Sequence, residues 1–138
     1  MAHWLLKTEP DDFSWDEMLA RGKKGEAWTG VRNSQARNFI KEMKKDDLAF
    51  FYHTGDEKRV VGVVKVIKEA YPDPTSDDER WLVVDVAAVE PVAKPVTLAA
   101  IKAEPKLAEM KLVKNARLSV QPVTAAEWKY VRKMGGMK

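Results

Sequence analysis

A short segment near the start of the chain concentrates residue types that suit a flat, polar ligand. It reads EAWTGVRNSQARN from Glu26 to Asn38, and within seven positions it contains Trp28, Gly30, Arg32, Asn33 and Ser34. A nucleobase presents a π face and an edge of hydrogen-bond donors and acceptors, so its pocket needs an aromatic or guanidinium plane with polar groups at the edge. We therefore predict that this segment forms one wall of a nucleobase pocket.

Each residue of the segment has a plausible role in that pocket. Trp28 would supply the plane, and Asn33 and Ser34 would face the edge of the base. Gly30 would let the backbone approach closely, and Arg32 would stack or hold a phosphate. The residues alone leave a second interpretation open, in which Trp28 belongs to the core, Gly30 to a turn and Asn33 to a helix cap.

The residues that catalysis would require are scarce. The chain has no cysteine and only two histidines, which excludes disulfides and thiolate metal sites. It has no nucleophile elbow, phosphate-binding loop or dinucleotide fingerprint. Its paired carboxylates, in EPDD, KKDD and TSDDE, read as ordinary surface charge. We predict a protein that is not an enzyme, with no catalytic residues, no metal and no cofactor.

Two other functions are kept as alternatives. Tyr52, His53 and Thr54 end an apolar stretch, so the chain could be a hydrolase acting on a modified nucleotide with His53 as general base. It could also be a protein-interaction module that uses WKYVRKMGGMK near its end, although we expect Trp128 and Val131 to dock on the core. His3, beside Trp4, is expected to pack or to face solvent.

The overall composition fits one small globular domain, residues 1–138. Of the 138 residues, 45% are hydrophobic and 33% are charged, which is enough apolar material for a core. The 24 Lys and Arg residues nearly balance 21 Asp and Glu, so the net charge of +3 leans only weakly towards anionic partners. Apolar runs are too short to span a bilayer and no signal peptide is apparent, so we expect a cytoplasmic monomer without membrane association.

Hydrophobic periodicity and capping signals predict a mixture of strands and helices. The expected strands are 3–8, 47–54, 59–70, 81–92 and 115–123. The expected helices follow the capping box of Ser14 and Glu17, Asn33 or Ser34, Thr97, and the second capping box of Thr124 and Glu127. Because these elements do not alternate regularly, we expect an α+β domain built around a strongly bent mixed sheet or small barrel.

Many short blocks in the chain resemble the EVE domain family: WLLKTEP, FSW, W-x-GVRN-x-QARN, FFYH, VVGVVKV, YPDPT, PVTLAAIK and RLSVQPVT. They occur in order from about Trp4 to about Trp128. The resemblance implies a PUA-like fold, which is a bent pseudo-barrel sheet with flanking short helices. It also implies a non-catalytic reader that binds a modified base, such as a methylated or hydroxymethylated cytosine, in DNA or RNA.

The same resemblance, together with the segment described above, gives a set of expected ligand-binding residues: Lys7, Thr8, Ser14, Trp15, Trp28, Gly30, Val31, Arg32, Asn33, Ser34, Tyr52, His53, Thr54, Arg117 and Ser119. The chain departs from the family pattern at two positions, because the family usually has Asp in place of Thr29 and Tyr in place of Ser34. These changes remove a negative charge and an aromatic face, so the resemblance does not assign one particular modified base.

Overall fold

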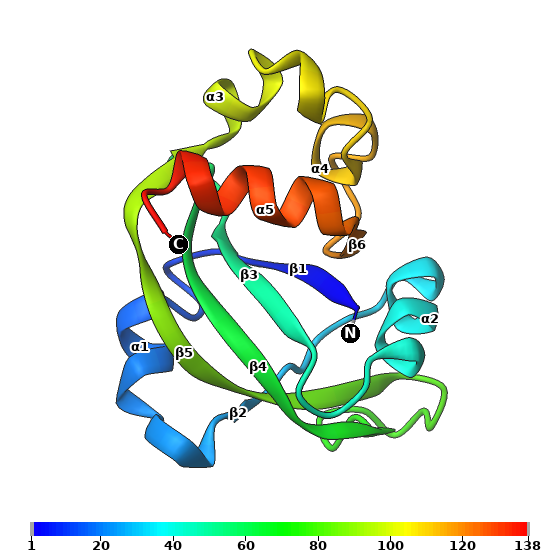
Figure 1. Ribbon diagram of the computed structural model, residues 1–138. Coiled ribbons are helices and arrows are strands. Elements are labelled where there is room, and N and C mark those ends of the chain that lie inside the picture. The colour runs from blue at the N-terminus through cyan, green and yellow to red at the C-terminus, as the bar shows by residue number, and fades with distance from the viewer. Residues whose placement is uncertain (1, 138) are drawn as a thin grey trace.

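The computed structural model describes residues 2–137, and over these residues a single six-stranded mixed sheet organises the chain (Figure 1). Its strand order is β2-β5-β4-β3-β1-β6. Strands β1 and β3 pair in parallel, and the other neighbours pair antiparallel. The strands are β1 (His3–Thr8), β2 (Glu26–Ala27), β3 (Leu48–His53), β4 (Arg59–Pro72), β5 (Leu82–Thr97) and β6 (Val120–Val123).

Short helices connect and cover the strands. They are α1 (Trp15–Ala20), α2 (Ser34–Glu42), α3 (Leu98–Lys102), α4 (Lys111–Lys114) and α5 (Ala125–Met134), with single 3₁₀ turns η1 (Gly22–Lys24) and η2 (Pro105–Leu107). The expected caps are confirmed. Ser14 and Glu17 form a capping box on α1, and Thr124 and Glu127 form one on α5. The Asn33 side chain accepts a hydrogen bond from the Ala36 N–H at the start of α2.

The two faces of the sheet carry two separate apolar clusters. Successive strand residues point to opposite faces, so the neighbours Phe50 and Phe51 of β3 belong to different clusters. Phe51 packs with buried residues of α1 and α2, whereas Phe50 packs with buried residues of α3, α4 and α5. The sheet is therefore shared between both clusters, with α1 and α2 covering one side and α3 to α5 the other (Figure 1).

Strands β4 and β5 are longer than the sequence pattern predicts. They reach Pro72 and Thr97, and their pairing contains several register shifts. Irregularities of this kind increase the local twist and bend a strand. Figure 1 shows both strands curving across the molecule. The expected α+β class with a strongly bent mixed sheet is confirmed.

The strand expected at 115–123 is wrong in its first half, because only Val120–Val123 is a strand. The Gln121 side-chain amide donates to the backbone carbonyls of Asn115 and Leu118, which holds residues 115–119 in a turn. The alternation that suggested a longer strand therefore reflects a loop folded back on itself. The short elements β2 and α4 were not expected.

One carboxylate that was expected on the surface lies in the interior. Asp47 of KKDD is buried, and its side chain accepts hydrogen bonds from Trp4 Nε1 and the Lys44 N–H, each at 3.0 Å. The surface-charge interpretation is wrong for Asp47.

Trp128 and Val131 are buried as expected, and the His3 ring stacks on Trp128 at 4.5 Å between centroids. None of the helices within the described residues is long and apolar enough to cross a membrane.

Candidate functional site

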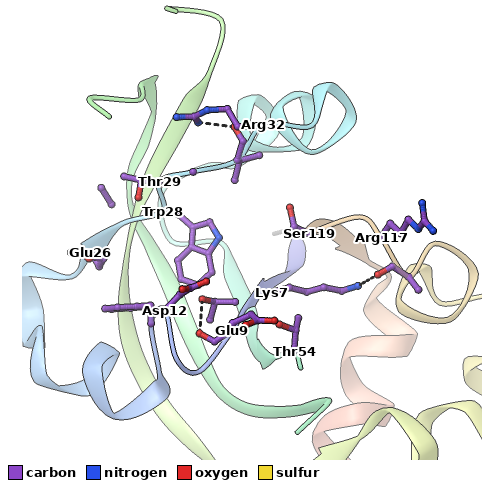
Figure 2. Close-up of a pocket in the computed structure, with 16 residues that line it drawn as sticks. Lys7, Glu9, Asp12, Glu26, Trp28, Thr29, Arg32, Thr54, Arg117 and Ser119 are labelled. Atoms are coloured by element: carbon purple, nitrogen blue, oxygen red, sulfur yellow. Dashed lines mark hydrogen bonds between the residues drawn. The ribbon is translucent and has the colours of Figure 1, made fainter. Parts of the chain in front are cut away.

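A cavity of about 580 Å³ opens where the end of β1 meets the segment from β2 to α2 and the loop before β6 (Figure 2). This volume lies in the range typical of small-ligand pockets. Polar and charged side chains make up much of its lining. The lining residues are Lys7, Thr8, Glu9, Asp12, Phe13, Glu26, Ala27, Trp28, Thr29, Gly30, Val31, Arg32, Thr54, Ala116, Arg117 and Ser119.

Backbone hydrogen bonds fix one side of the cavity to the end of β1. The Lys7 N–H donates to the Ser119 carbonyl at 3.0 Å, and Lys7 Nζ donates to the Ala116 carbonyl at 2.6 Å. The Thr54 N–H donates to the Thr8 carbonyl at 2.9 Å. Three segments that are far apart in the sequence are thereby held together around the cavity. Burial lowers the pKa of Lys7, whose ammonium has no carboxylate partner among the described residues.

The opposite wall is held in place by Asp73, which comes from the YPDPT loop after β4. The Asp73 side chain is fully buried, and its carboxylate accepts from the Gly30 N–H and from Arg32 Nη1, each at 3.0 Å. It also accepts from the backbone N–H and the hydroxyl of Thr75. Gly30 has a φ of 82°, a left-handed conformation that favours glycine. Asp73 therefore fixes the turn that carries Arg32 past the cavity.

These hydrogen bonds determine the charge of Asp73. Burial alone would raise the pKa of this carboxyl. The hydrogen bonds donated by Thr75, Arg32 and Gly30 outweigh burial and lower the pKa to about 2. Asp73 is therefore ionised at neutral pH, and the negative charge is neutralised by the Arg32 guanidinium.

Trp28 lies between the core and the cavity. Its side chain is only 7% exposed and makes T-shaped contacts with Phe13 and Phe51. Trp28 is therefore a core residue, as the second interpretation expects, and it also lines the cavity. In Figure 2 the indole nitrogen points into the cavity, and within the described residues it has no hydrogen-bond partner. Trp28 thus presents an N–H group and a small part of its ring to the cavity.

The structure brings most of the expected binding residues to this cavity. Those that line it are Lys7, Thr8, Trp28, Gly30, Val31, Arg32, Thr54, Arg117 and Ser119. The others, which lie outside the lining, are Ser14, Trp15, Asn33, Ser34, Tyr52 and His53.

Local structural roles explain most of the residues outside the lining. Ser14 and Asn33 cap α1 and α2, and Ser34 is the exposed first residue of α2. Trp15 packs in the first cluster, directly over Gly62. Tyr52 belongs to the second cluster, where burial raises its pKa to about 12.

His53 is buried and both of its ring nitrogens are engaged. Nε2 accepts a hydrogen bond from the Trp15 N–H at 3.0 Å, at the first turn of α1. Nδ1 therefore carries the proton and donates to Glu57 Oε1 at 2.8 Å. This bond, assisted by one from Arg59, lowers the pKa of Glu57. His53 thus satisfies a helix N–H group that would otherwise be buried without a partner.

Sequence reasoning missed the acidic part of the cavity. Glu9, Asp12 and Glu26 all line it, although EPDD was interpreted as ordinary surface charge. The short strand β2 brings Glu26 there by pairing with β5, and no local pattern in the sequence signals that pairing. Among the described residues, no group of three or more His, Cys, Asp or Glu side chains is arranged to hold a metal ion.

The bent mixed sheet, with a polar cavity at the end of its parallel strand pair, agrees with the PUA-like α+β class expected from the sequence blocks. The chain belongs to the EVE domain family, whose model matches residues 2–134. The family assignment made from the sequence blocks is thereby confirmed.

Relatives and solved structures extend this similarity over nearly the whole chain. Thymocyte nuclear protein 1 of Mus musculus is 35% identical, with 94% of this chain and 71% of that protein covered. A crystal structure of a protein from Agrobacterium tumefaciens is 48% identical with a TM-score of 0.98, covering 99% of this chain and 94% of that chain. Human THYN1 protein, in complex with 5-methylcytosine containing DNA, is 34% identical with a TM-score of 0.92. The match covers 100% of this chain and 99% of that chain.

A more distant structure shares the fold alone. The YTH domain of the Zygosaccharomyces rouxii MRB1 protein, in complex with N6-methyladenosine RNA, is 15% identical with a TM-score of 0.58. The superposition covers 97% of this chain and 86% of that chain. The PUA-like architecture expected from the sequence blocks agrees with this likeness.

Proposed function

We propose that this protein is a non-catalytic nucleic-acid-binding module that holds a modified nucleobase in the cavity beside Trp28. The observation that carries the proposal is this cavity, which has an aromatic N–H at its edge, in a chain that aligns over its full length with human THYN1 in complex with 5-methylcytosine containing DNA. A base inserted there would meet the Trp28 ring edge, backbone groups around Gly30 and the hydroxyls of Thr54 and Ser119.

The partner we propose is DNA or RNA that carries a modified base, bound without a metal or cofactor by a monomeric protein. The hydrolase alternative has less support, because His53 lies outside the cavity lining and both of its ring nitrogens are hydrogen bonded. A general base needs a free lone pair within reach of the substrate. The cytoplasmic location expected from the sequence stays a prediction.

Substituting Trp28 with alanine would test the cavity poorly, since losing a buried tryptophan costs about 3–5 kcal/mol of stability. Trp28→Phe keeps a ring against Phe51 and removes the indole N–H. We expect it to fold cooperatively and to bind a fluorescein-labelled DNA duplex containing 5-methylcytosine about tenfold more weakly, the cost of one hydrogen bond. Fluorescence anisotropy would give the dissociation constants.

The matched control is Trp128→Phe. Trp128 is also nearly buried, at 5% exposure, but it stacks on Phe50 in the second cluster and does not line the cavity. This variant should lose a comparable amount of stability and keep wild-type binding. Equal affinity of the Trp28→Phe and Trp128→Phe proteins for methylated DNA, or no preference of the wild type for either modified DNA or modified RNA over the unmodified strands, would contradict the proposed function.

A further inference from the structure

Positive charge is distributed unevenly along the chain. Residues 98–137 contain eight Lys and Arg against three Asp and Glu, whereas residues 2–97 contain fifteen against eighteen. The excess positive charge therefore belongs to the last part of the chain, which forms α3, α4, β6 and α5. In Figure 1 the helices of this part gather on one side of the sheet. A local excess of basic charge is typical of a surface that meets nucleic acid.

Part of this basic region reaches the cavity. Arg117 lines the cavity from the loop between α4 and β6, together with Ala116. Lys114 precedes Ala116 by two residues, so their Cα atoms lie within about 7 Å. Lys111 and Lys114 are three positions apart on α4, which places them on one side of the helical turn. Arg117 therefore lies at the cavity, and Lys114 and Lys111 lead away from it along α4, where Lys111 borders a separate small pocket beside Glu109 and Glu127.

These cations are available to an external partner. All three are exposed, and among the described residues the side chains of Lys111 and Arg117 have no hydrogen bond or ion pair. Lys114 Nζ lies 3.6 Å from Glu109 Oε2, but their side chains are 56% and 85% exposed. A pair so exposed is weak and is readily exchanged for another anion. Nearby, Lys7 spends one of its three N–H donors on the Ala116 carbonyl.

The opposite rim of the cavity is less suited to a phosphate. Arg32 lies there, but its guanidinium already donates to Asp73, to the Val31 carbonyl and to Thr75. The loop that holds it, residues 73–80, contains four carboxylates and one arginine. Asp73 and Asp78 are paired with Arg32 and Arg80, which leaves the exposed carboxylates of Asp77 and Glu79 to oppose a phosphate backbone.

We propose that Lys111, Lys114 and Arg117 form the phosphate-binding track of the protein. A nucleic-acid strand whose modified base occupies the cavity would leave it across α4 and the following loop, and would keep away from the loop 73–80. This inference rests on the proposed function and adds the direction in which the strand runs. Phosphates provide most of the sequence-independent affinity for nucleic acid, so the track would set the salt dependence of binding.

The test is a salt titration of a variant with Lys111→Gln, Lys114→Gln and Arg117→Gln, using a duplex containing 5-methylcytosine. Each phosphate contact removed should reduce the slope of log K against log salt by about 0.9 between about 50 and 200 mM salt. The matched control is Lys41→Gln, Lys44→Gln and Lys45→Gln, three exposed lysines in the last turn of α2 and the segment just after it. It changes the net charge equally but should keep the wild-type slope.

The outcomes separate this inference from the proposed function. A slope that falls only in the variant changed at Lys111, Lys114 and Arg117 supports the phosphate-binding track. Equal slopes in both triple variants, or a larger fall in the control, would overturn it, while binding that still depends on Trp28 would leave the proposed function intact. Thermal unfolding of both variants checks that they are folded, and the single change Arg117→Gln repeats the test with minimal disturbance. Failure of the proposed function would instead appear as wild-type affinity in Trp28→Phe.

Discussion

At the scale of single residues, hydrogen-bond partners decide what a polar side chain does. His53 stands among polar neighbours at the end of β3, a setting that suggested a general base. Its Nε2 instead accepts from the Trp15 N–H, and its Nδ1–H donates to Glu57. The ring therefore links the start of α1 to the sheet, and we expect its loss to change stability rather than binding.

Replacing His53 with alanine should lower stability and leave binding intact. The Trp15 N–H would be buried without an acceptor, which costs about 1–3 kcal/mol. Chemical denaturation followed by circular dichroism would measure the free energy of unfolding, and anisotropy the affinity. The control His3→Ala removes a half-buried ring that stacks on Trp128 and satisfies no backbone group. A His53→Ala protein as stable as the His3→Ala protein would contradict this role.

The lowered pKa of Asp73 predicts how the stability of the protein depends on pH. Its pKa is lowered in the folded state to about 2, so its contribution is present at pH values above its ordinary pKa of about 4. This contribution is lost as pH falls from about 4 to 2. Asp73→Asn should reduce the free energy of unfolding at neutral pH by about 1–2 kcal/mol, because Arg32 loses its partner. It should also flatten the decline in stability across the acid range.

Urea unfolding at several pH values would test this behaviour. Asp78→Asn is the control, because Asp78 also pairs with an arginine, Arg80, but its side chain is 40% exposed. Water screens such a pair, so we expect a smaller effect. If the stability of the Asp73→Asn protein falls as steeply between pH 4 and 2 as that of the wild type, Asp73 is not the source of this loss of stability in acid. Sequence reasoning missed Asp73 because its partners, Gly30 and Arg32, are about forty positions earlier in the chain.

At the scale of elements, the sequence predicts those that depend on local signals and misses those that depend on contacts between distant residues. The capping residues Ser14, Asn33 and Thr124 act within three positions, so the sequence shows their helices directly. The two-residue strand β2 exists only because β5 pairs with it, and no local pattern reveals this. Residues 115–119 alternate like a strand but are held in a turn by Gln121, a contact that periodicity does not encode.

The contact between α1 and β4 gives a prediction at the same scale. A Cβ atom added at Gly62 would lie 2.4 Å from ring atoms of Trp15, closer than any packing contact allows. Gly62 is not among the glycines with positive φ, so the penalty would be steric. We expect Gly62→Ala to destabilise the protein by about 1–3 kcal/mol through overpacking.

A double-mutant cycle would assign this cost to the Trp15 ring. In a Trp15→Phe background the smaller ring leaves room for the methyl group, so Gly62→Ala should cost less than in the wild type. The free energies of unfolding of the four proteins give the coupling. Additive effects would show that the methyl group meets some other part of the structure.

At the scale of the whole molecule, the two apolar clusters lie on opposite faces of one sheet, and every strand except β2 contributes residues to both. Phe50 and Phe51 are adjacent on β3 yet pack in different clusters. Neither cluster can lose its packing without disturbing the strand that carries the other. The prediction of one domain over residues 1–138 therefore becomes a prediction of a single cooperative unfolding transition.

Trp128→Phe allows a direct test of that cooperativity. Trp128 belongs to the second cluster, whereas Trp4, Trp15 and Trp28 belong to the first. Most of the tryptophan fluorescence of this variant therefore comes from the first cluster. The substitution removes packing only from the second cluster. If the clusters unfold together, the fluorescence midpoint in urea should fall below that of the wild type and coincide with the circular dichroism midpoint. Helix signal lost before the fluorescence change would mean that residues 98–137 unfold as a separate unit, since α3, α4 and α5 would then leave the sheet while the first cluster stays packed.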